Sequence, residues 1–488
     1  MTDIWDAIIV GGGFSGLAMA GRLQRAGGWR FLVLEQDGAV GGTWRDNRYP
    51  GCACDVPSHL YSLSFAPAYD WPRRFAGYRD IRAHLEAAAQ PLRPHLRCNA
   101  RVAAADFDAA AALWNITLAD GGTLRTRFLI AGLGPLNRPA LPDFPGLERF
   151  SGPVFHSMSW PQDLSCEGLR VAVVGTGASA VQIVPALASQ ARQLTVFQRT
   201  APWVVAKGDR PYSPLARAAF RRLPGLRRLY RAWLYLSQEI VGLAFLHPAL
   251  MRLAQRRVRQ GLARRLPDPA LRAQLEPTHT MGCKRILLSD DYYETLQRPH
   301  VRLVTAPVAH VAPGALVTAD GREHAADVLV FATGFRHAEV APEPAIRGCG
   351  GQTLQQAWRD RRAAYLGCAV AGFPNFFLLG GPNSGLGHNS VLFMIEAQAH
   401  WILQALRTAR RRNLRTIGLK AASYAKTLEE MARRSRTTVW ESGCRSWYLD
   451  ENGNNTAIWP GLSAEFWLRT RRFNERDFHL ETHERPAP

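Results

Sequence analysis

The sequence predicts an α/β fold with two separate, doubly wound sheets, because one pattern of buried strand, glycine-rich turn and helix occurs twice. The first copy begins at residues 6–10 and the second at residues 169–174. With 488 residues, the chain is long enough for two or three packed domains. Hydrophobic residues make up 47% of it and charged residues 20%, which is typical of a globular protein.

The first copy has the spacing of a dinucleotide-binding fingerprint. Strand 6–10 leads into the turn 11–16, then into a helical pattern at 17–26 and an apolar strand, 31–34, that ends in Glu35. Glycines let the backbone approach a pyrophosphate at the helix N-terminus, and the acid accepts hydrogen bonds from ribose hydroxyls. The amino-terminal position favours FAD. The residues expected to bind it are Gly11, Gly13, Phe14, Ser15, Gly16 and Glu35.

The second copy differs at the end of its second strand. Strand 169–174 precedes the turn 175–180, a helix is expected from Val181, and strand 194–197 ends in an arginine in place of an acid. A guanidinium at this point attracts a 2′-phosphate, so this copy favours NADPH, although a solvated surface arginine is the alternative. The residues expected to bind NADPH here are Gly175, Thr176, Gly177, Ala178, Ser179, Ala180, Gln198, Arg199 and Thr200.

Two nucleotide-binding folds in one chain imply that a hydride passes from NADPH to the flavin. A dithiol acceptor is disfavoured because no CxxC motif occurs, and Cys52 and Cys54 form a CxC that is too tight for a redox helix. The eight cysteines are scattered, so we expect reduced thiols and no metal site. Dioxygen is the acceptor that remains.

The net charge of +20 raises the alternative of nucleic-acid binding. We discount it because only four of the sixty basic residues are lysines, as in arginine-rich chains from GC-rich codon usage, and because no nucleic-acid-binding module is visible. The first residues lack the pattern of a secretory signal, and no apolar run of eighteen or more residues occurs. A cytoplasmic protein without a transmembrane span is therefore expected.

The segment between the two folds, FSGPVFHSMSWP at 150–161, matches every fixed position of the fingerprint FxGxxxHxxxW. The chain thereby resembles the type I Baeyer–Villiger monooxygenases. Flavin-containing monooxygenases that attack nitrogen and sulfur carry a related pattern, usually with Tyr or Phe at the last position, so Trp160 favours the Baeyer–Villiger branch. The resemblance continues through GGTWRDNRYPGCACD at 41–55, the stretch 55–65, CKR at 283–285, FATGF at 331–335 and GPNSGLGHNS at 381–390.

The resemblance implies a reaction. NADPH reduces FAD, dioxygen adds to give a flavin C4a-peroxide, and the peroxide attacks a ketone to form an ester or a lactone. Arg285 is the catalytic candidate, because a guanidinium stays charged and can hold the peroxide as an anion. Asp55 would orient Arg285, and an ordinary buried ion pair is the alternative for the two. His156 is expected to position the domains relative to each other.

Further cofactor contacts are implied by the same motifs. Lys284 would reach the 2′-phosphate with Arg199, and Trp447 would touch the nicotinamide ribose or the substrate. For Trp44 and Tyr49, packing in the hydrophobic core is the alternative to a role in the site. The additional cofactor-binding residues implied are Gly42, Thr43, Trp44, Asp55, Tyr61, Asn389, Lys284 and Trp447.

Both domains are expected to be discontinuous. The FAD domain would comprise residues 1–149 and 336–488, and the NADP domain residues 150–206 and 281–335, with a helical insertion at 207–280. The substrate would bind between the domains.

The insertion holds thirteen arginines and a single acid, Glu239, between Arg210 and Arg265. It is expected either to form a packed lobe with a solvated basic face, as its place in the family suggests, or to make weak peripheral contact with an anionic membrane.

Two alternatives for the function stay open at this point. One is an N- or S-oxygenating monooxygenase, and the other is an uncoupled NADPH oxidase or a redox-sensing flavoprotein without a substrate. The segment after Tyr448 departs from the cyclohexanone-type enzymes, so a preference for ring ketones is open as well. The oligomeric state is open.

Overall fold

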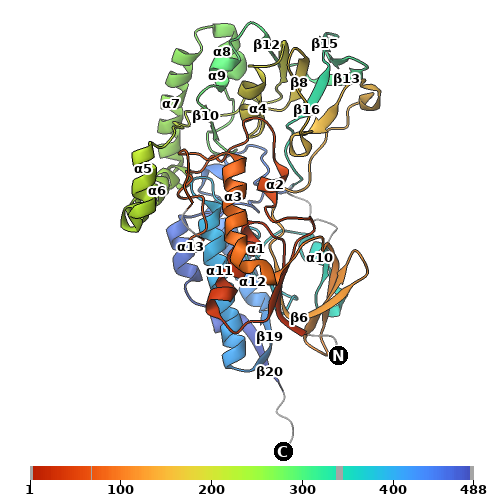
Figure 1. Ribbon diagram of the computed structural model, residues 1–488, viewed down its shortest axis with the longest axis vertical. Helices are drawn as coiled ribbons and strands as arrows, with labels where there is room; N and C mark the ends of the chain where they lie inside the picture. Colours follow the sequence, from red (N-terminus) through yellow and green to blue (C-terminus); the bar gives the residue numbers. More distant parts are fainter. Residues whose placement is uncertain (1–3, 67–68, 337–343, 484–488) are drawn as a thin grey trace, which may run out of the picture.

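The computed structural model describes residues 4–66, 69–336 and 344–483 (Figure 1). Two sheets, each covered by helices, lie one above the other in Figure 1, and a group of helices flanks them on one side. The lower sheet is built from the amino-terminal third of the chain together with residues beyond 344, and the upper sheet from the segment between them.

The lower sheet has eight strands in the order β17-β4-β5-β6-β1-β2-β3, with β18 paired to β6. Strand β1 runs parallel to β2 and β6, whereas β4, β5 and β6 form an antiparallel meander. The strands are β1 Ile4–Val10, β2 Phe31–Leu34, β3 Leu96–Arg97, β4 Val102–Asp108, β5 Leu113–Leu118, β6 Thr123–Ala131, β17 Ala345–Arg347 and β18 Phe376–Leu378.

Helices cover this sheet around a core in which Trp401 is fully buried. Helix α1 packs beside α11, and both contribute to the same apolar cluster as β1. The helices of this part are α1 Phe14–Ala26, α2 Thr43–Asp46, α3 Tyr78–Ala89, α10 Leu354–Ala357, α11 Val391–Arg411, α12 Ala421–Ser435 and α13 Ser463–Thr470. A two-stranded sheet of β19 Leu414–Leu419 and β20 Phe478–Thr482 lies beside α11.

The upper sheet has five parallel strands in the order β12-β9-β8-β16-β7. Its elements are β7 Val154–His156, β8 Arg170–Val174, α4 Ala180–Leu187, β9 Gln193–Phe197, α9 Tyr292–Thr295, β12 Val301–Val304 and β16 Val328–Phe331. Two small sheets accompany it, namely β10 Val204–Val205 with β11 Leu287–Leu288, and β13 Val308–Ala312 with β14 Ala315–Thr318 and β15 Glu323–Ala325.

The strands and helices predicted at the two glycine turns are confirmed, with one shift. Helix α1 begins at Phe14 and not at Leu17, because the last residues of the turn already have helical geometry. Gly16 lies in this first turn, where a Cβ would stand 1.8 Å from the carbonyl oxygen of Gly11. A glycine is required there because the strand end and the helix start touch.

The expected helical insertion is present as four helices; α5, α6 and α7 lie on the left flank of Figure 1, and α8 lies at the top. They are α5 Pro214–Arg222, α6 Pro224–Leu246, α7 Pro248–Arg265 and α8 Pro269–Leu275. Each begins with proline, whose fixed φ and missing N–H suit the first helical position. No single helix of the described chain is long and apolar enough to cross a membrane; α6 and α7 reach that composition only together, and they are bent by 105°.

Candidate functional site

The first glycine turn and Gly42 form a closely packed backbone cradle at the end of β1. Gly13 and Gly42 face each other, and a Cβ on Gly42 would lie 3.4 Å from the Cα of Gly13. Gly11 and Gly42 both have positive φ, at 107° and 49°, which glycine adopts without strain. Two backbone segments without side chains therefore meet at the N-terminus of α1, the position that suits a pyrophosphate.

Glu35 lies beside this cradle. Its Oε2 accepts a hydrogen bond of 2.7 Å from the backbone N–H of Gly12, and its Oε1 accepts one of 3.1 Å from Arg45 Nη1. Oε1 also accepts a hydrogen bond of 3.1 Å from Asp37 N, so of the about four acceptor positions of a carboxylate one remains for a ribose hydroxyl. The residues are compatible with the adenosine half of a dinucleotide.

Three aromatic side chains from the predicted set meet next to the cradle. The Trp44 Nε1 donates a hydrogen bond of 3.0 Å to the hydroxyl of Tyr61. The rings of Phe14 and Tyr61 make an edge contact with centroids 5.2 Å apart. Trp44 and Tyr61 are partly buried and pack against the hydrophobic core that includes α1.

The segment 49–55 packs directly on α4 of the upper sheet. Gly51 has a φ of 79°, and a Cβ there would stand 2.5 Å from the backbone oxygen of Gln182. The Gln182 side chain accepts a hydrogen bond of 2.9 Å from Ala53 N and donates one of 3.1 Å to Ala53 O. The buried Tyr49 interacts through its hydroxyl with Ser179 in the second glycine turn. This segment therefore joins the two nucleotide-binding halves.

Asp55 and Arg285, 230 residues apart, form an ion pair at this junction. Arg285 Nε and Nη2 lie 2.7 Å and 2.6 Å from Asp55 Oδ2. The Asp55 charge raises the pKa of the guanidinium above its ordinary value, despite the opposing effect of burial. Arg285 therefore keeps its charge at every working pH.

The hydroxyl of Tyr448 interacts with Arg285 and was not predicted as a site residue. Burial raises the pKa of Tyr448 to about 12, which Arg285 only partly offsets, so the phenol stays neutral and can donate a hydrogen bond. The one feature of the sequence that indicated Tyr448 as a site residue was its position next to Trp447, which was predicted to bind a cofactor.

The second glycine turn is open where the first is tight. Gly175, with a φ of 115°, packs against the backbone of Ala332, whereas nothing lies within 4 Å of a Cβ built on Gly177. The hydroxyl of Thr176 donates a hydrogen bond of 2.9 Å to the carbonyl of Thr200, which joins the turn to the segment that follows β9.

Two cations converge near this turn. Burial lowers the pKa of Lys284, and the charge of Arg199 lowers it further, so the two lie within electrostatic range of each other. Neither contacts a carboxylate among the described residues, and Arg199 is exposed. Two cations held together without an anion fit a doubly charged phosphate. Gln198, by contrast, is buried and donates 2.7 Å to the carbonyl of Gln274.

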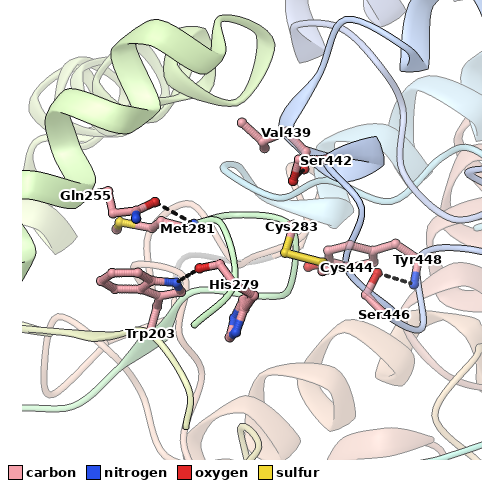
Figure 2. The surroundings of a disulfide bond; sticks show 10 residues. All are labelled: Trp203, Gln255, His279, Met281, Cys283, Val439, Ser442, Cys444, Ser446 and Tyr448. Carbon is pink, nitrogen blue, oxygen red and sulfur yellow. Dashed lines mark hydrogen bonds between the residues drawn. A yellow bond between two sulfur atoms is a disulfide. The ribbon is translucent and has the colours of Figure 1, made fainter. Parts of the chain in front are cut away.

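Cys283 and Cys444 form a disulfide (Figure 2), so the expectation that all thiols are reduced is wrong for this pair. Their Cα atoms are 6.3 Å apart, within the range of about 4.4–6.8 Å that a disulfide requires. The two cysteines are 161 residues apart in sequence, and only the fold brings them together. The bond ties the segment of Lys284 and Arg285 to the segment of Trp447 and Tyr448.

Asn389, predicted near the flavin, lies just before α11 and is engaged by the insertion. Its Nδ2 donates 2.8 Å to Glu239 Oε1, and His388 Nε2 lies 3.3 Å from the same oxygen. Ser463 Oγ donates 2.6 Å to it as well. Burial opposes the charge of Glu239, but these hydrogen bonds outweigh it and lower the pKa of Glu239 to about 2. Glu239, the single acid between residues 210 and 265, thus fixes α6 to the segment 388–389 and to Ser463.

His156 lies at the linker between the two halves, in keeping with the predicted positional role. Its Nδ1 accepts 3.2 Å from Met158 N, and its ring contacts that of Phe335 edge-on at 5.3 Å. In the same motif, a Cβ on Gly152 would stand 2.0 Å from the carbonyl oxygen of Asp327. Trp160 is buried against Phe155, with centroids 5.0 Å apart.

A glycine cradle with an acidic ribose partner and a second turn with two converging cations together define a flavoprotein oxidoreductase that uses NADPH. Comparisons with known proteins agree. Residues 9–75 match an NAD(P)-binding Rossmann-like domain, and residues 105–234 match the flavin-binding monooxygenase-like family.

Two relatives called Baeyer–Villiger monooxygenases are similar over nearly the whole chain. One, from Streptomyces coelicolor, is 44% identical over 98% of this chain and 93% of its own length. The other, from Pseudomonas aeruginosa, is 41% identical over 97% and 91%. The crystal structure of OTEMO in complex with FAD and NADP covers 98% of this chain and 100% of its own, with a TM-score of 0.89 and 29% identity. The chain belongs to the Baeyer–Villiger monooxygenases, which are NADPH-dependent flavoproteins.

Replacing Arg199 by glutamine should weaken the selectivity for NADPH. Loss of one charge-assisted contact to a phosphate costs about 1.5–3 kcal/mol, which is roughly a 10–100-fold rise in KM for NADPH. The KM for NADH should stay nearly constant because NADH lacks the phosphate. Steady-state kinetics with both coenzymes would measure this. Arg192→Gln, at the other end of β9, is the matched control; an equal rise for both coenzymes would contradict the assignment.

Replacing Cys283 by serine should lower the stability of the oxidised protein. A crosslink that closes a loop of 161 residues contributes at most about 5 kcal/mol by the chain-entropy estimate. Urea unfolding should show a lower midpoint, and a dithiol reductant should lower the midpoint of the parent protein but not that of the variant. Cys349→Ser, which removes an exposed free thiol, is the control. Alkylation of Cys283 in the untreated native protein would show that the bond is absent.

Replacing Glu239 by glutamine should destabilise the protein at neutral pH by about 1–3 kcal/mol, since an amide cannot accept from both Ser463 and the Ala464 N–H. The folded pKa of about 2 lies below the ordinary value of 4.5, so the ionised group stabilises the fold above pH 4.5. That contribution is lost as the pH falls toward 2. The difference in unfolding free energy between the two proteins should therefore shrink on acidification; a constant difference would argue against the charge.

Proposed function

We propose that the chain converts ketones to esters or lactones at the junction of its two nucleotide-binding halves, with Arg285 as the catalytic residue. The observation that carries this proposal is the ion pair of Arg285 with Asp55, at 2.6–2.7 Å, between the segment that faces the flavin cradle and the segment next to Lys284. NADPH supplies the hydride, and FAD supplies the activation of dioxygen. The residues of the chain bind the two cofactors, orient the reacting groups and hold a positive charge beside them.

The role of Arg285 follows from its geometry. Its Nε and Nη2 face Asp55, so the guanidinium is oriented by one edge, and its other N–H groups remain for an oxygen anion. Its side chain is about one-third exposed, at 32%, so a reacting group can reach it. A preorganised cation beside a developing oxyanion lowers the barrier without reorganisation of the solvent. Asp55 acts as a positioning residue, and the neutral Tyr448 hydroxyl accepts a hydrogen bond from the same guanidinium.

The proposed domain division assigns the two cofactors to the two sheets. The FAD domain comprises 1–149 and 336–488, and this is supported by β17 and β18, which return from beyond residue 344 to the lower sheet. The NADP domain comprises 150–206 and 281–335, and its five parallel strands lie between 154 and 331. The insertion 207–280 contains α5 to α8.

The proposed cofactor contacts follow the two turns. Phe14, Trp44 and Tyr61 line the edge of the flavin cradle, and Ser15 lies at its base beside Gly380. Arg199 and Lys284 hold the 2′-phosphate. Asn389 supports the flavin side through the backbone of its segment, because its amide is occupied by Glu239.

Replacing Arg285 by alanine should leave flavin reduction by NADPH intact and lower ester formation about 100–1,000-fold, the usual cost of removing an oxyanion donor. Anaerobic stopped-flow absorbance would follow the reduction, and chromatography would quantify the ester from cyclic, linear and aryl ketones. Arg285→Lys keeps the charge but loses the forked donor geometry of the guanidinium. Its rate of ester formation should therefore lie between those of the parent protein and Arg285→Ala. Arg433→Ala on α12, an exposed arginine, is the matched control.

Two outcomes would overturn the proposal. Undiminished ester yield in Arg285→Ala would remove Arg285 from the catalytic step. Oxygenation of a sulfide or an amine by the parent protein, with no product from any ketone of the panel, would assign the chain to heteroatom oxygenation instead.

A further inference from the structure

Helix α6 carries an apolar stripe on its solvent-facing side. Its six members recur at alternating steps of three and four residues, the spacing that places side chains on one face of a helix. Their exposed fractions run from 38% to 71%, so the stripe is not covered by the described chain. At about 1.5 Å per residue it is roughly 26 Å long. The stripe consists of Leu226, Leu229, Trp233, Leu236, Ile240 and Leu243.

The opposite face of α6 is fixed to the rest of the protein. The buried Glu239 binds the segment at 388–389, and Arg231 Nη1 donates 2.8 Å to the carbonyl of His59. Leu234 and Phe245 are buried on this side. The helix thus has a complete inner contact, and its outer apolar stripe is additional surface.

The surroundings of the stripe are strongly basic. Glu239, the single acid between residues 210 and 265, is buried, so this stretch presents no exposed carboxylate. Acids elsewhere pair with Arg217, Arg259 and Arg265. Between residues 210 and 265, seven exposed arginines contact no carboxylate of the described residues; besides Arg210 and Arg264, five of them flank or follow α6. These are Arg222 and Arg228 around the start of α6, and Arg252, Arg256 and Arg257 on α7.

We infer that α6 docks flat on an anionic lipid bilayer, with the stripe in the headgroup boundary and the arginines on lipid phosphates. An amphipathic helix with basic flanks binds anionic membranes by buried apolar area plus charge attraction. In Figure 1, α5, α6 and α7 form the outer left flank of the molecule, so this helix can approach a plane. Leu250 and Leu253, exposed at the start of α7, extend the apolar surface.

A second copy of the chain is the competing occupant of the stripe. Steps of three and four residues also suit helix–helix packing. Charge disfavours this occupant, because a symmetric pair of α6 helices would bring two sets of unpaired arginines together without an acid on either surface. Anionic lipid supplies the missing negative charge.

Vesicle flotation of the holoenzyme tests the inference. The protein should float with phosphatidylcholine vesicles that contain phosphatidylglycerol, remain behind with phosphatidylcholine alone, and dissociate as salt is raised. The double variant Trp233→Ser/Ile240→Ser should lose at least about tenfold in vesicle affinity, and Arg222→Gln/Arg228→Gln about twenty-fivefold, at about fivefold per arginine. Both should retain the NADPH oxidation rate with a water-soluble ketone.

The controls are Leu468→Ser on α13, where leucine is 59% exposed, and Arg433→Gln on α12, which should leave binding unchanged. Absence of flotation, or binding that neither lipid charge nor salt affects, would overturn the inference. So would a dimer in sedimentation velocity that the Trp233→Ser/Ile240→Ser variant converts to monomer, since the stripe would then be an interface between copies.

Discussion

The contact of Gly51 with α4 is the constraint on which the rest of the site depends. The absence of a side chain at residue 51 lets the segment approach the backbone of Gln182, and the Gln182 amide then holds Ala53 by both its N–H and its carbonyl. Two residues further on, Asp55 reaches Arg285 at 2.7 Å. The flavin-side segment and the NADP-side segment are thus placed relative to each other by backbone packing, and the ion pair follows from that placement.

The site uses its cations in two different ways. Asp55 binds one edge of the Arg285 guanidinium and thereby fixes its orientation, and the positive charge is presented by the other edge. Lys284 and Arg199 have no such partner among the described residues, and burial, followed by the charge of Arg199, lowers the pKa of Lys284. Two neighbouring cations without a carboxylate partner are stabilised most by binding a dianion. A guanidinium that already has a carboxylate partner stabilises a reacting oxyanion mainly through its fixed orientation. In the proposed function, the adjacent residues 284 and 285 therefore serve binding and catalysis separately.

Local patterns predicted both glycine turns, their strands and Glu35, because a strand–turn–helix unit is encoded within about thirty residues. The start of α1 was placed three residues late, since the turn continues into helical geometry at Phe14. The contacts that assemble the site join residues far apart in the sequence, so local sequence patterns could not predict them. The disulfide joins positions 161 apart, and the Asn389–Glu239 hydrogen bond spans 150 residues. No spacing in the sequence encodes such pairs; Gln182 carried no signal at all, whereas Glu239, alone among thirteen arginines, was a visible one.

Helix α6 connects these long-range contacts with the surface. Its inner face carries Glu239, whose hydrogen bonds hold the segment at 388–389, and its outer face carries the apolar stripe. In the proposed membrane contact, the stripe therefore docks on one face of the helix that holds residues 388 and 389 on the other. The two faces are separable because they share no side chain: Glu239→Gln alters the inner contact alone, and Trp233→Ser/Ile240→Ser alters the outer surface alone.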